Sequence, residues 1–388
     1  MSPEPNRLAR SVAPSATMAA AAAGSRHPDP IPLTVGEPAE LPPPEAVEAA
    51  RRALAEGRTR YGPAAGLGGL RASLAAEFCE RTGRTASSEN VIVTVGGKGA
   101  LMGALRCILE PGDAVALLAP YWPTFADQAA WCGARPLILP PGGDGLPDPA
   151  ELDAALAADG QVRVLVLNSP SNPTGRVLEA ERIEALVEVA RSHDLWILSD
   201  EVYRTFVFEG EATSPARYAW DEGRVVVIES FSKRFSMTGY RVGAAIAPAE
   251  LVGAMTRLAQ AATTHTCTAS QHAALAALEV GPAWDAAQRQ RYRARRDRAH
   301  AALSALPDVR CARPEGAFYL LPDVTAWVRR RGLAGVDELA DELRHEDGLL
   351  VTPGGAFGAP GHLRLSLGLD DARLDEALER LGVAAQPA

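Results

Sequence analysis

The chain has 388 residues, which is more than one simple core accommodates and predicts a large domain plus a smaller one. Hydrophobic residues make up 47% and charged residues 22%, a globular composition that excludes a disordered chain. The formal net charge of -9 is spread along the sequence without a block of like charges. This argues against a nucleic-acid partner, since phosphate binding needs a concentrated basic surface.

Cysteine usage indicates a reducing compartment. The five cysteines are odd in number and include no CxxC pair, which argues against a disulfide framework and against a zinc knuckle. We therefore expect free thiols, no metal site and a cytoplasmic location.

The N-terminal stretch predicts an arm. Residues 2–44 are rich in Pro, Ala and Ser, with one short helix expected at 18–23. Arg7 and Arg10 lie before this helix as in a signal peptide, but the run is too short and too weakly apolar for one. We expect no membrane span.

From residue 44 onward, helix and strand patterns alternate. Leu70, Leu74 and Phe78, for example, have helical spacing. Helices are predicted at 45–56, 70–81, 100–109 and 179–191, and strands at 91–95, 114–119, 135–139, 162–167, 196–199, 224–228 and 243–247. This order predicts an α/β fold with a mostly parallel sheet, which binds ligands at the carboxyl ends of its strands.

A long polar helix is predicted at 284–303, with six arginines. Such a run is found in nucleic-acid patches, but its spacing favours a solvated linker helix between two domains. We expect an arm (1–45) that packs with the small domain, a large domain (46–283) and a small C-terminal domain (284–388).

Polar clusters follow three of the predicted buried strands. They are Asn172–Gly175 (NPTG), Asp200–Tyr203 (DEVY) and Ser230–Lys233 (SFSK), with Arg241 eight positions after the lysine. Each cluster alone is weak, since NPTG is an ordinary turn sequence and a lone lysine is usually exposed. Together, in this order, they predict one site.

This set resembles the fold-type I, pyridoxal 5′-phosphate (PLP)-dependent aminotransferases of class I/II. The resemblance covers about residues 15–382. It includes the flanking signatures Leu33–Pro38, Tyr61–Gly66, Pro120–Trp122, Pro314–Tyr319 and Pro353–Phe357. It implies a large α/β domain with a mostly parallel sheet and a smaller α+β C-terminal domain.

The resemblance also implies the catalytic roles. Lys233 matches the lysine that forms a Schiff base with PLP, and its amine then moves a proton at the substrate Cα. Asp200 matches the carboxylate that keeps the pyridine nitrogen protonated. Tyr203 and Asn172 match the hydrogen-bond donors to the cofactor 3′ oxygen.

The cofactor phosphate is expected at a helix N-terminus, where free N–H groups favour an anion. The implied phosphate ligands are Gly97, Lys98, Gly99, Ser230 and Arg241. Many relatives have Gln at the position of Gly99, so a looser helix start is expected there.

Other roles carried over from the family concern the ring, the partner subunit and the substrate. Trp122 is expected to stack on the cofactor ring. Tyr61 matches a tyrosine that reaches the phosphate from the neighbouring subunit, which implies a homodimer with shared sites. Arg364 matches the arginine that binds the substrate α-carboxylate, helped by Gly36 and Asn172.

Substrate specificity is less defined by the sequence. Some relatives that act on dicarboxylates place an arginine from the partner subunit in the segment 263–270, where this chain has His265 instead. His265, with Tyr121 and Phe318, is a candidate for contact with the substrate side chain. Arg106 is a weaker candidate for an acidic side chain, because an exposed helical arginine is the commoner case.

The leading hypothesis is an aminotransferase that moves an amino group from an L-amino acid to a 2-oxo acid by a ping-pong mechanism. The alternative is elimination, cyclisation or oxidation of an amino acid on the same cofactor. A transcription factor with this fold needs a DNA-binding domain, and the arm is too short for one. A degenerate binding protein is disfavoured because the catalytic set is intact.

Overall fold

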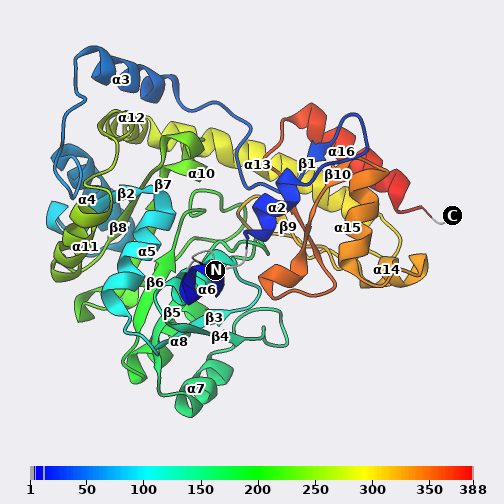
Figure 1. The fold of residues 1–388 in the computed structure, drawn as a ribbon, viewed down its shortest axis with the longest axis horizontal. Coiled ribbons are helices and arrows are strands. Elements are labelled where there is room, and N and C mark those ends of the chain that lie inside the picture. The colour runs from blue at the N-terminus through cyan, green and yellow to red at the C-terminus, as the bar shows by residue number, and fades with distance from the viewer. Residues whose placement is uncertain (1–3, 5, 12–13, 387–388) are drawn as a thin grey trace.

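A seven-stranded sheet forms the centre of the larger part of the chain (Figure 1). The computed structural model describes residues 4, 6–11 and 14–386. The strand order is β2-β8-β7-β6-β5-β3-β4, and only β8 runs antiparallel to its neighbours. The predicted α/β fold with a mostly parallel sheet is thus confirmed, with strands β2 (Val91–Val95), β3 (Ala114–Leu118), β4 (Arg135–Leu139), β5 (Val162–Asn168), β6 (Trp196–Asp200), β7 (Val225–Ser230) and β8 (Val242–Ile246).

Helices cover both faces of this sheet. Successive strand residues alternate between two core clusters, so that Val91 and Val93 pack on one face and Ile92 on the other. One face is covered by α4 (Gly68–Thr82), α7 (Pro149–Ala158), α8 (Ala180–Ser192) and α12 (Thr268–Glu279), and α3 (Pro44–Ala55) packs on α12. The other face is covered by α5 (Gly96–Ile108), α6 (Thr124–Trp131) and α11 (Ala249–Ala262).

Helices α6, α7, α11 and α12 have no counterpart among the predicted elements. The buried face of α12 consists largely of alanines, namely Ala269, Ala273, Ala274 and Ala277. Alanine contrasts only weakly with the polar face of a helix, and α6 spans just eight residues. Hydrophobic periodicity therefore gives little signal for these two helices.

The C-terminal part has its own core around a three-stranded antiparallel sheet of order β11-β12-β9. Its strands are β9 (Tyr319–Leu320), β11 (Thr352–Pro353) and β12 (Leu363–Ser366), and its helices are α14 (Thr325–Arg331), α15 (Val336–His345) and α16 (Asp371–Ala384). Helix α13 (Gly281–Ser304, yellow in Figure 1) runs from the sheet-bearing part into this region. The predicted boundaries at 45/46 and 283/284 remain predictions.

The expectation of a solvated Arg-rich helix is wrong for two of its arginines. Arg295 and Arg296 on α13 are 2% and 0% exposed. Arg295 pairs with Glu40 and Asp371, and Arg296 pairs with Glu209 and Asp297. Packing of α16 and of the 206–209 segment against α13 buries this face, so these arginines join the helix to its neighbours.

The N-terminal segment contacts both parts of the structure. The predicted short helix is present as α2 (Ala16–Ala22), with Ser15 as its N-cap, and an unpredicted α1 (Arg7–Ser11) contacts α6. Strand β1 (Ile31–Pro32) pairs with β10 (Leu349–Leu350) of the C-terminal part. The predicted arm also includes residues 1–3, 5 and 12–13, which lie outside the described residues. Within the described residues, every helix is too short or too polar to cross a bilayer.

Candidate active site

One cavity collects nearly all of the predicted site residues. It lies at the carboxyl ends of β5, β6 and β7, where open α/β sheets bind ligands, and it has an empty volume of about 960 Å³. Eleven of the thirteen predicted residues line it: Gly36, Gly97, Lys98, Trp122, Asn172, Asp200, Tyr203, Ser230, Lys233, Arg241 and Arg364.

The lining of this cavity is strongly cationic. Four basic side chains face it (Lys98, Lys233, Arg241 and Arg364), against one carboxylate, Asp200. Most arginines elsewhere form ion pairs, but within the described residues none of these four has a carboxylate within 4.0 Å. Unpaired cations gathered in one cavity are costly unless an anionic ligand joins them. The cavity therefore suits a ligand or ligands with several negative charges.

Lys233 lies in a short helical turn, α10 (Phe231–Arg234), directly after β7. Its ammonium donates a hydrogen bond to the carbonyl oxygen of Gly36 at 2.5 Å. Burial lowers the pKa of Lys233 to about 8, and Glu37 opposes this shift while the cations Arg364, Arg241 and Lys98 add to it. A lysine with this pKa is a usable nucleophile near neutral pH.

Asp200 is the last residue of β6 and is 5% exposed. Burial raises the pKa of its carboxyl to about 7; the hydrogen bond from the Val202 N–H (3.3 Å) counteracts this, and the nearby carboxylates Glu201 and Glu229 add to it. A buried carboxylate with one backbone donor and no cationic partner in the described residues is stabilised as an anion only when a cation or strong donor binds it.

Arg364 in β12 is 1% exposed and reaches the cavity from the C-terminal part. Its guanidinium donates to Asn172 Oδ1 at 3.1 Å and to the carbonyl oxygen of Thr34, while its Nε has no partner. Burial lowers its pKa, and the faces of Tyr319 and Phe357 lie 4.7 and 4.8 Å away. A buried guanidinium held by neutral groups suits a planar carboxylate ligand.

The other end of the cavity has the donors that an anion requires. The N–H groups of Gly97 and Lys98 open α5 and have no intrahelical acceptor. The Arg241 guanidinium packs on Gly96, where a Cβ would lie 2.6 Å from Nη2, so glycine is needed at this positive φ of 70°. Ser230 Oγ accepts from the Ser232 N–H, which leaves the hydroxyl proton available for a ligand.

Two predicted residues lie outside this cavity. Gly99 lies against Thr94, on the side of α5 opposite to Gly97. Gly97 and Gly99 are two positions apart, which in an α-helix is a rotation of about 200°. Tyr61 is 88% exposed on the surface, with its ring 6.0 Å from that of His265.

The candidate specificity residues also lie outside the cavity. His265 accepts from the Gly62 N–H through Nε2, and Phe318 is fully buried in the C-terminal core. Arg106 is exposed on α5, where it contacts the carbonyl oxygen of Trp131. Tyr121 lines a smaller neighbouring cavity.

Sequence reasoning missed part of the lining. Ser15, Thr17 and Met18 reach the cavity from the N-terminal arm, and Tyr319 reaches it from β9. The signature Pro314–Tyr319 marked the region of Tyr319, but no local pattern shows that its side chain faces Tyr203 and Arg364. The contact with Tyr203 joins positions 116 residues apart in sequence, and the contact with Arg364 joins two separate strands, which only the folded chain shows.

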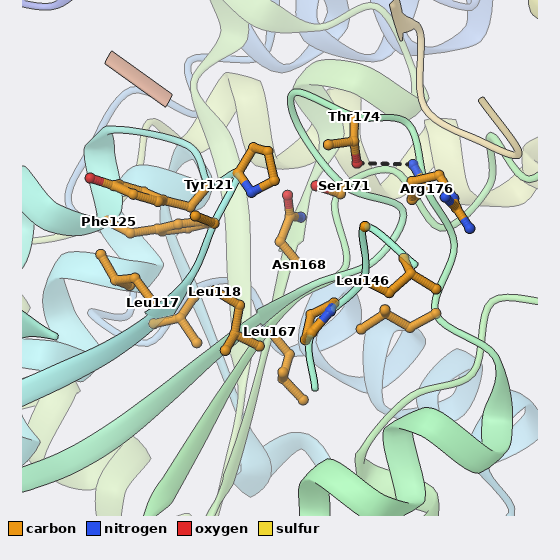
Figure 2. A pocket seen from close by; sticks show the side chains of 16 residues that line it. Leu117, Leu118, Tyr121, Phe125, Leu146, Leu167, Asn168, Ser171, Thr174 and Arg176 are labelled. Carbon is orange, nitrogen blue, oxygen red and sulfur yellow. Dashed lines mark hydrogen bonds between the residues drawn. The ribbon is translucent and has the colours of Figure 1, made fainter. Parts of the chain in front are cut away.

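The smaller cavity adjoins the first and shares Asn168 with it (Figure 2). Leu117, Leu118, Leu146 and Leu167 surround it, together with Tyr121. Its one basic residue, Arg176, is paired with Glu315 at 3.0 Å. It therefore lacks the unpaired charges of the main cavity.

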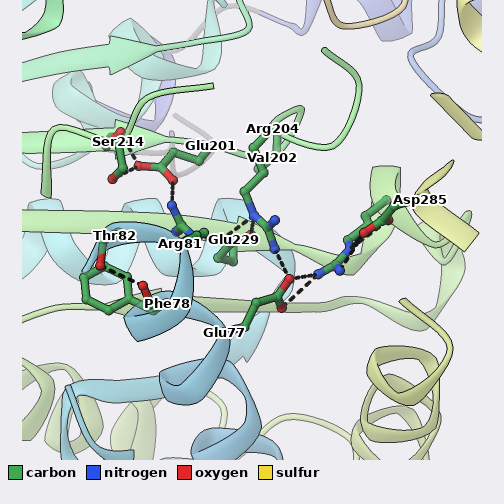
Figure 3. Close-up of polar contacts among 12 residues, drawn as sticks. Glu77, Phe78, Arg81, Thr82, Glu201, Val202, Arg204, Ser214, Glu229 and Asp285 are labelled. Atoms are coloured by element: carbon green, nitrogen blue, oxygen red, sulfur yellow. Dashed lines mark hydrogen bonds and ion pairs between the residues drawn. The ribbon is translucent and has the colours of Figure 1, made fainter. Parts of the chain in front are cut away.

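A buried to half-buried group of ion pairs lies next to the strand ends that carry the site (Figure 3). We call it the strand-end network, and it consists of Glu77, Arg81, Glu201, Arg204, Glu229, Arg234 and Asp285. Four of its members directly adjoin a cavity residue in sequence, in the pairs Asp200–Glu201, Tyr203–Arg204, Glu229–Ser230 and Lys233–Arg234. The network thus anchors the same backbone that presents the site.

Comparisons with known proteins agree with this geometry. The family "Aminotransferase class I and II" matches residues 28–381. The aspartate/prephenate aminotransferase of Thermus thermophilus is 39% identical and covers 97% of both chains, and the arginine–pyruvate transaminase of Pseudomonas aeruginosa is 36% identical over 91% of this chain and 89% of its own. The structure of Thermus thermophilus aspartate aminotransferase with maleate superposes with a TM-score of 0.92 at 37% identity, over 98% of this chain and 100% of that one. The chain therefore belongs to the class I and II aminotransferase family.

Proposed function

We propose that this chain is a PLP-dependent aminotransferase that transfers an amino group from an L-amino acid to a 2-oxo acid. The observation that carries the proposal is the cavity with four unpaired basic side chains around Lys233 and Asp200. A phosphate and a substrate carboxylate supply the missing negative charges. The names of the relatives support amino-group transfer over elimination, cyclisation or oxidation.

The residues present fit PLP. When bound, PLP supplies an electron-withdrawing ring that weakens the Cα–H bond of an amino acid. Lys233 would hold the cofactor aldehyde through its amine and then move the proton at the substrate Cα. Asp200 would hold the ring nitrogen in its protonated form, which supplies the cationic partner that this buried carboxylate lacks.

Two further side chains would donate hydrogen bonds to the cofactor 3′ oxygen. Asn172 Oδ1 already accepts from Arg364, which leaves the amide NH₂ as the group available to the cavity. Tyr203 is fully buried and its pKa is raised well above the usual value, mainly by burial, so the phenol keeps its proton. Gly97, Ser230 and Arg241 would bind the phosphate, and the face of Trp122 would cover the ring.

The substrate class that we propose is a dicarboxylic amino acid such as aspartate. Arg241 would serve the phosphate and Arg364 the α-carboxylate, and Lys98 remains for a further carboxylate. Lys98 shares the cavity lining with the hydroxyl groups of Ser15 and Thr17. Burial and nearby Arg241 lower the pKa of Lys98, as expected of an ammonium that lacks its anion.

This assignment of Lys98 makes a selective prediction. Lys98→Met is expected to lower kcat/KM for aspartate and glutamate by about 10- to 100-fold, because one charged hydrogen bond is lost, with little change for alanine. Arg364→Lys is the matched comparison and should lower kcat/KM for all three donors alike. Equal losses for all donors in Lys98→Met, together with weaker PLP binding, would instead place Lys98 at the phosphate.

The function itself is tested on the purified protein with added PLP and a panel of L-amino acids. We expect a visible cofactor band, a borohydride-stable mass addition on the Lys233 peptide, and a 2-oxo acid from each accepted donor. Ammonia or a cyclic product in place of the 2-oxo acid would favour the alternative chemistry. No cofactor band at all would contradict the proposal.

We further propose that two copies of this chain share their active sites. Tyr61 does not line the cavity of its own chain, and four large apolar side chains are exposed within residues 41–61, in α3 and on either side of it: Leu41, Val47, Leu54 and Tyr61. Several exposed large apolar side chains in one short segment suit a subunit contact.

Subunit mixing tests this shared site. Tyr61→Phe and Lys233→Ala subunits, each impaired alone at limiting PLP, are expected to regain up to about a quarter of the wild-type activity when hybrids form at random. In a hybrid, the subunit with Lys233 then receives an intact tyrosine from its partner. Failure to regain activity in verified hybrids would place Tyr61 outside the partner's site.

A further inference from the structure

Tyr319 occupies a central position in the cavity that the sequence does not indicate. It lies in β9, is 2% exposed, and pairs in register with Ser366 of β12, two residues after Arg364. Its hydroxyl oxygen is 2.8 Å from that of Tyr203, and its ring lies 4.7 Å from the Arg364 guanidinium. It therefore touches one residue from the cofactor side and one from the substrate side.

We propose that Tyr319 is a positioning residue of this active site, which orients the Tyr203 hydroxyl by hydrogen bonding and holds Arg364 against its ring. The inference rests on the proposed function, because it assigns the Tyr203 proton to the cofactor 3′ oxygen.

The direction of the hydrogen bond between the two phenols follows from counting protons. A neutral phenol has one proton to donate and accepts at its oxygen. Burial raises the pKa of both phenols, so both stay protonated at neutral pH. If Tyr203 donates into the cavity, the proton between the two oxygens must belong to Tyr319. Tyr319 then directs the Tyr203 proton toward the ligand, and accepting this hydrogen bond strengthens Tyr203 as a donor.

The position of the Tyr319 hydroxyl is fixed by close packing. A Cβ on Gly36 would lie 1.7 Å from this oxygen, so the hydroxyl fills the space that any other residue at position 36 would use. The carbonyl oxygen of the same glycine accepts from Lys233 at 2.5 Å. Tyr319 therefore contacts the backbone segment that also holds the lysine.

The ring of Tyr319 contacts a different residue from its hydroxyl, namely Arg364. Arg364 has no carboxylate partner in the described residues, and it lies between the aromatic faces of Tyr319 and Phe357. An aromatic face attracts a guanidinium without neutralising its charge, which leaves the cation free for a substrate carboxylate. Removal of the ring should therefore affect substrate binding, and removal of the hydroxyl should affect cofactor binding.

The test is a double-mutant cycle on the binding of PLP to the apo-protein. Tyr319→Phe is expected to weaken PLP binding by about three- to tenfold, the range of one neutral hydrogen bond. In a Tyr203→Phe background, Tyr319→Phe should have almost no further effect, because the hydroxyl that it orients is gone. Tyr319→Leu should in addition raise KM for every amino donor by about fivefold or more, whereas Tyr319→Phe should leave KM within about twofold.

Tyr292→Phe is the matched control. Tyr292 is also fully buried in the C-terminal core, and its hydroxyl donates to Glu40 at 2.8 Å, outside the cavity. The Tyr292→Phe variant should have lower thermal stability than the wild type but the same affinity for PLP. The inference would be overturned if Tyr319→Phe left PLP binding unchanged. It would also be overturned if the double variant lost as much affinity as the product of the two single losses. A wild-type protein that fails to bind PLP would refute the proposed function itself.

Discussion

Replacement of Lys233 by alanine is expected to lower the rate of amino-group transfer by at least about 10³-fold, because the variant loses both its nucleophile and its proton carrier. The cavity should still bind PLP non-covalently, since the phosphate donors, Asp200 and Asn172 do not depend on the lysine. A single-turnover assay with aspartate, read as formation of the 2-oxo acid, measures the loss.

The pKa of Lys233 explains why this lysine is suited to the role. With a pKa of about 8, about a quarter of the side chains carry a free amine at pH 7.5, compared with roughly one in a thousand at the ordinary value. In the variant, borohydride should add no cofactor mass to the 233 position. Cofactor mass on another lysine, with activity retained, would contradict the assignment and shift attention to Lys98, the other lysine in the cavity.

The part of this site that follows buried strands could be predicted from the sequence pattern, whereas Gly36, Trp122 and Arg364 were assigned only through the family resemblance. In a parallel sheet, the carboxyl ends of neighbouring strands meet at one edge, so polar residues after β5, β6 and β7 converge without further information. Asn172, Asp200 and Lys233 are positioned by this rule.

Residues positioned by long-range packing were not predictable in the same way. Tyr319 enters the cavity because β9 pairs with β12, and short strands of two to four residues leave almost no periodic signal. The burial of Arg295 and Arg296 depends on which face of α13 is covered by α16, and a run of arginines has no apolar face that would show it. The strand-end network was not predicted for a related reason. Glu201 and Arg204 adjoin site residues in sequence, but Arg81 and Glu77, which pair with them, lie on the distant helix α4.

Arg234→Ala is expected to lower the free energy of unfolding by about 3 kcal/mol or more, because it removes a buried guanidinium and leaves two half-buried carboxylates, Glu77 and Asp285, without their counter-ion. Arg234 forms a bidentate pair with Asp285, from Nη2 to Oδ2 at 2.7 Å and from Nε to Oδ1 at 3.0 Å, and also binds Glu77 at 2.8 Å, with its side chain 9% exposed. Denaturant unfolding measures the change. Arg224→Ala, which removes an exposed ion pair with Asp194, is the control and should cost less than about 1 kcal/mol.

The acid limb of the stability curve provides an independent measurement on the same network. Burial opposes ionisation of Glu77, but Arg204 and Arg234 lower the pKa of its carboxyl to about 2, compared with an ordinary value of 4.5. Because the folded-state pKa is the lower one, this stabilisation is complete above about pH 4.5 and is lost as the pH falls toward 2. Arg234→Ala should therefore lose less stability than the wild type over that range. Equal acid sensitivity in both proteins would mean that Arg204 alone holds Glu77 ionised, and that Arg234 acts through Asp285 and α13 instead.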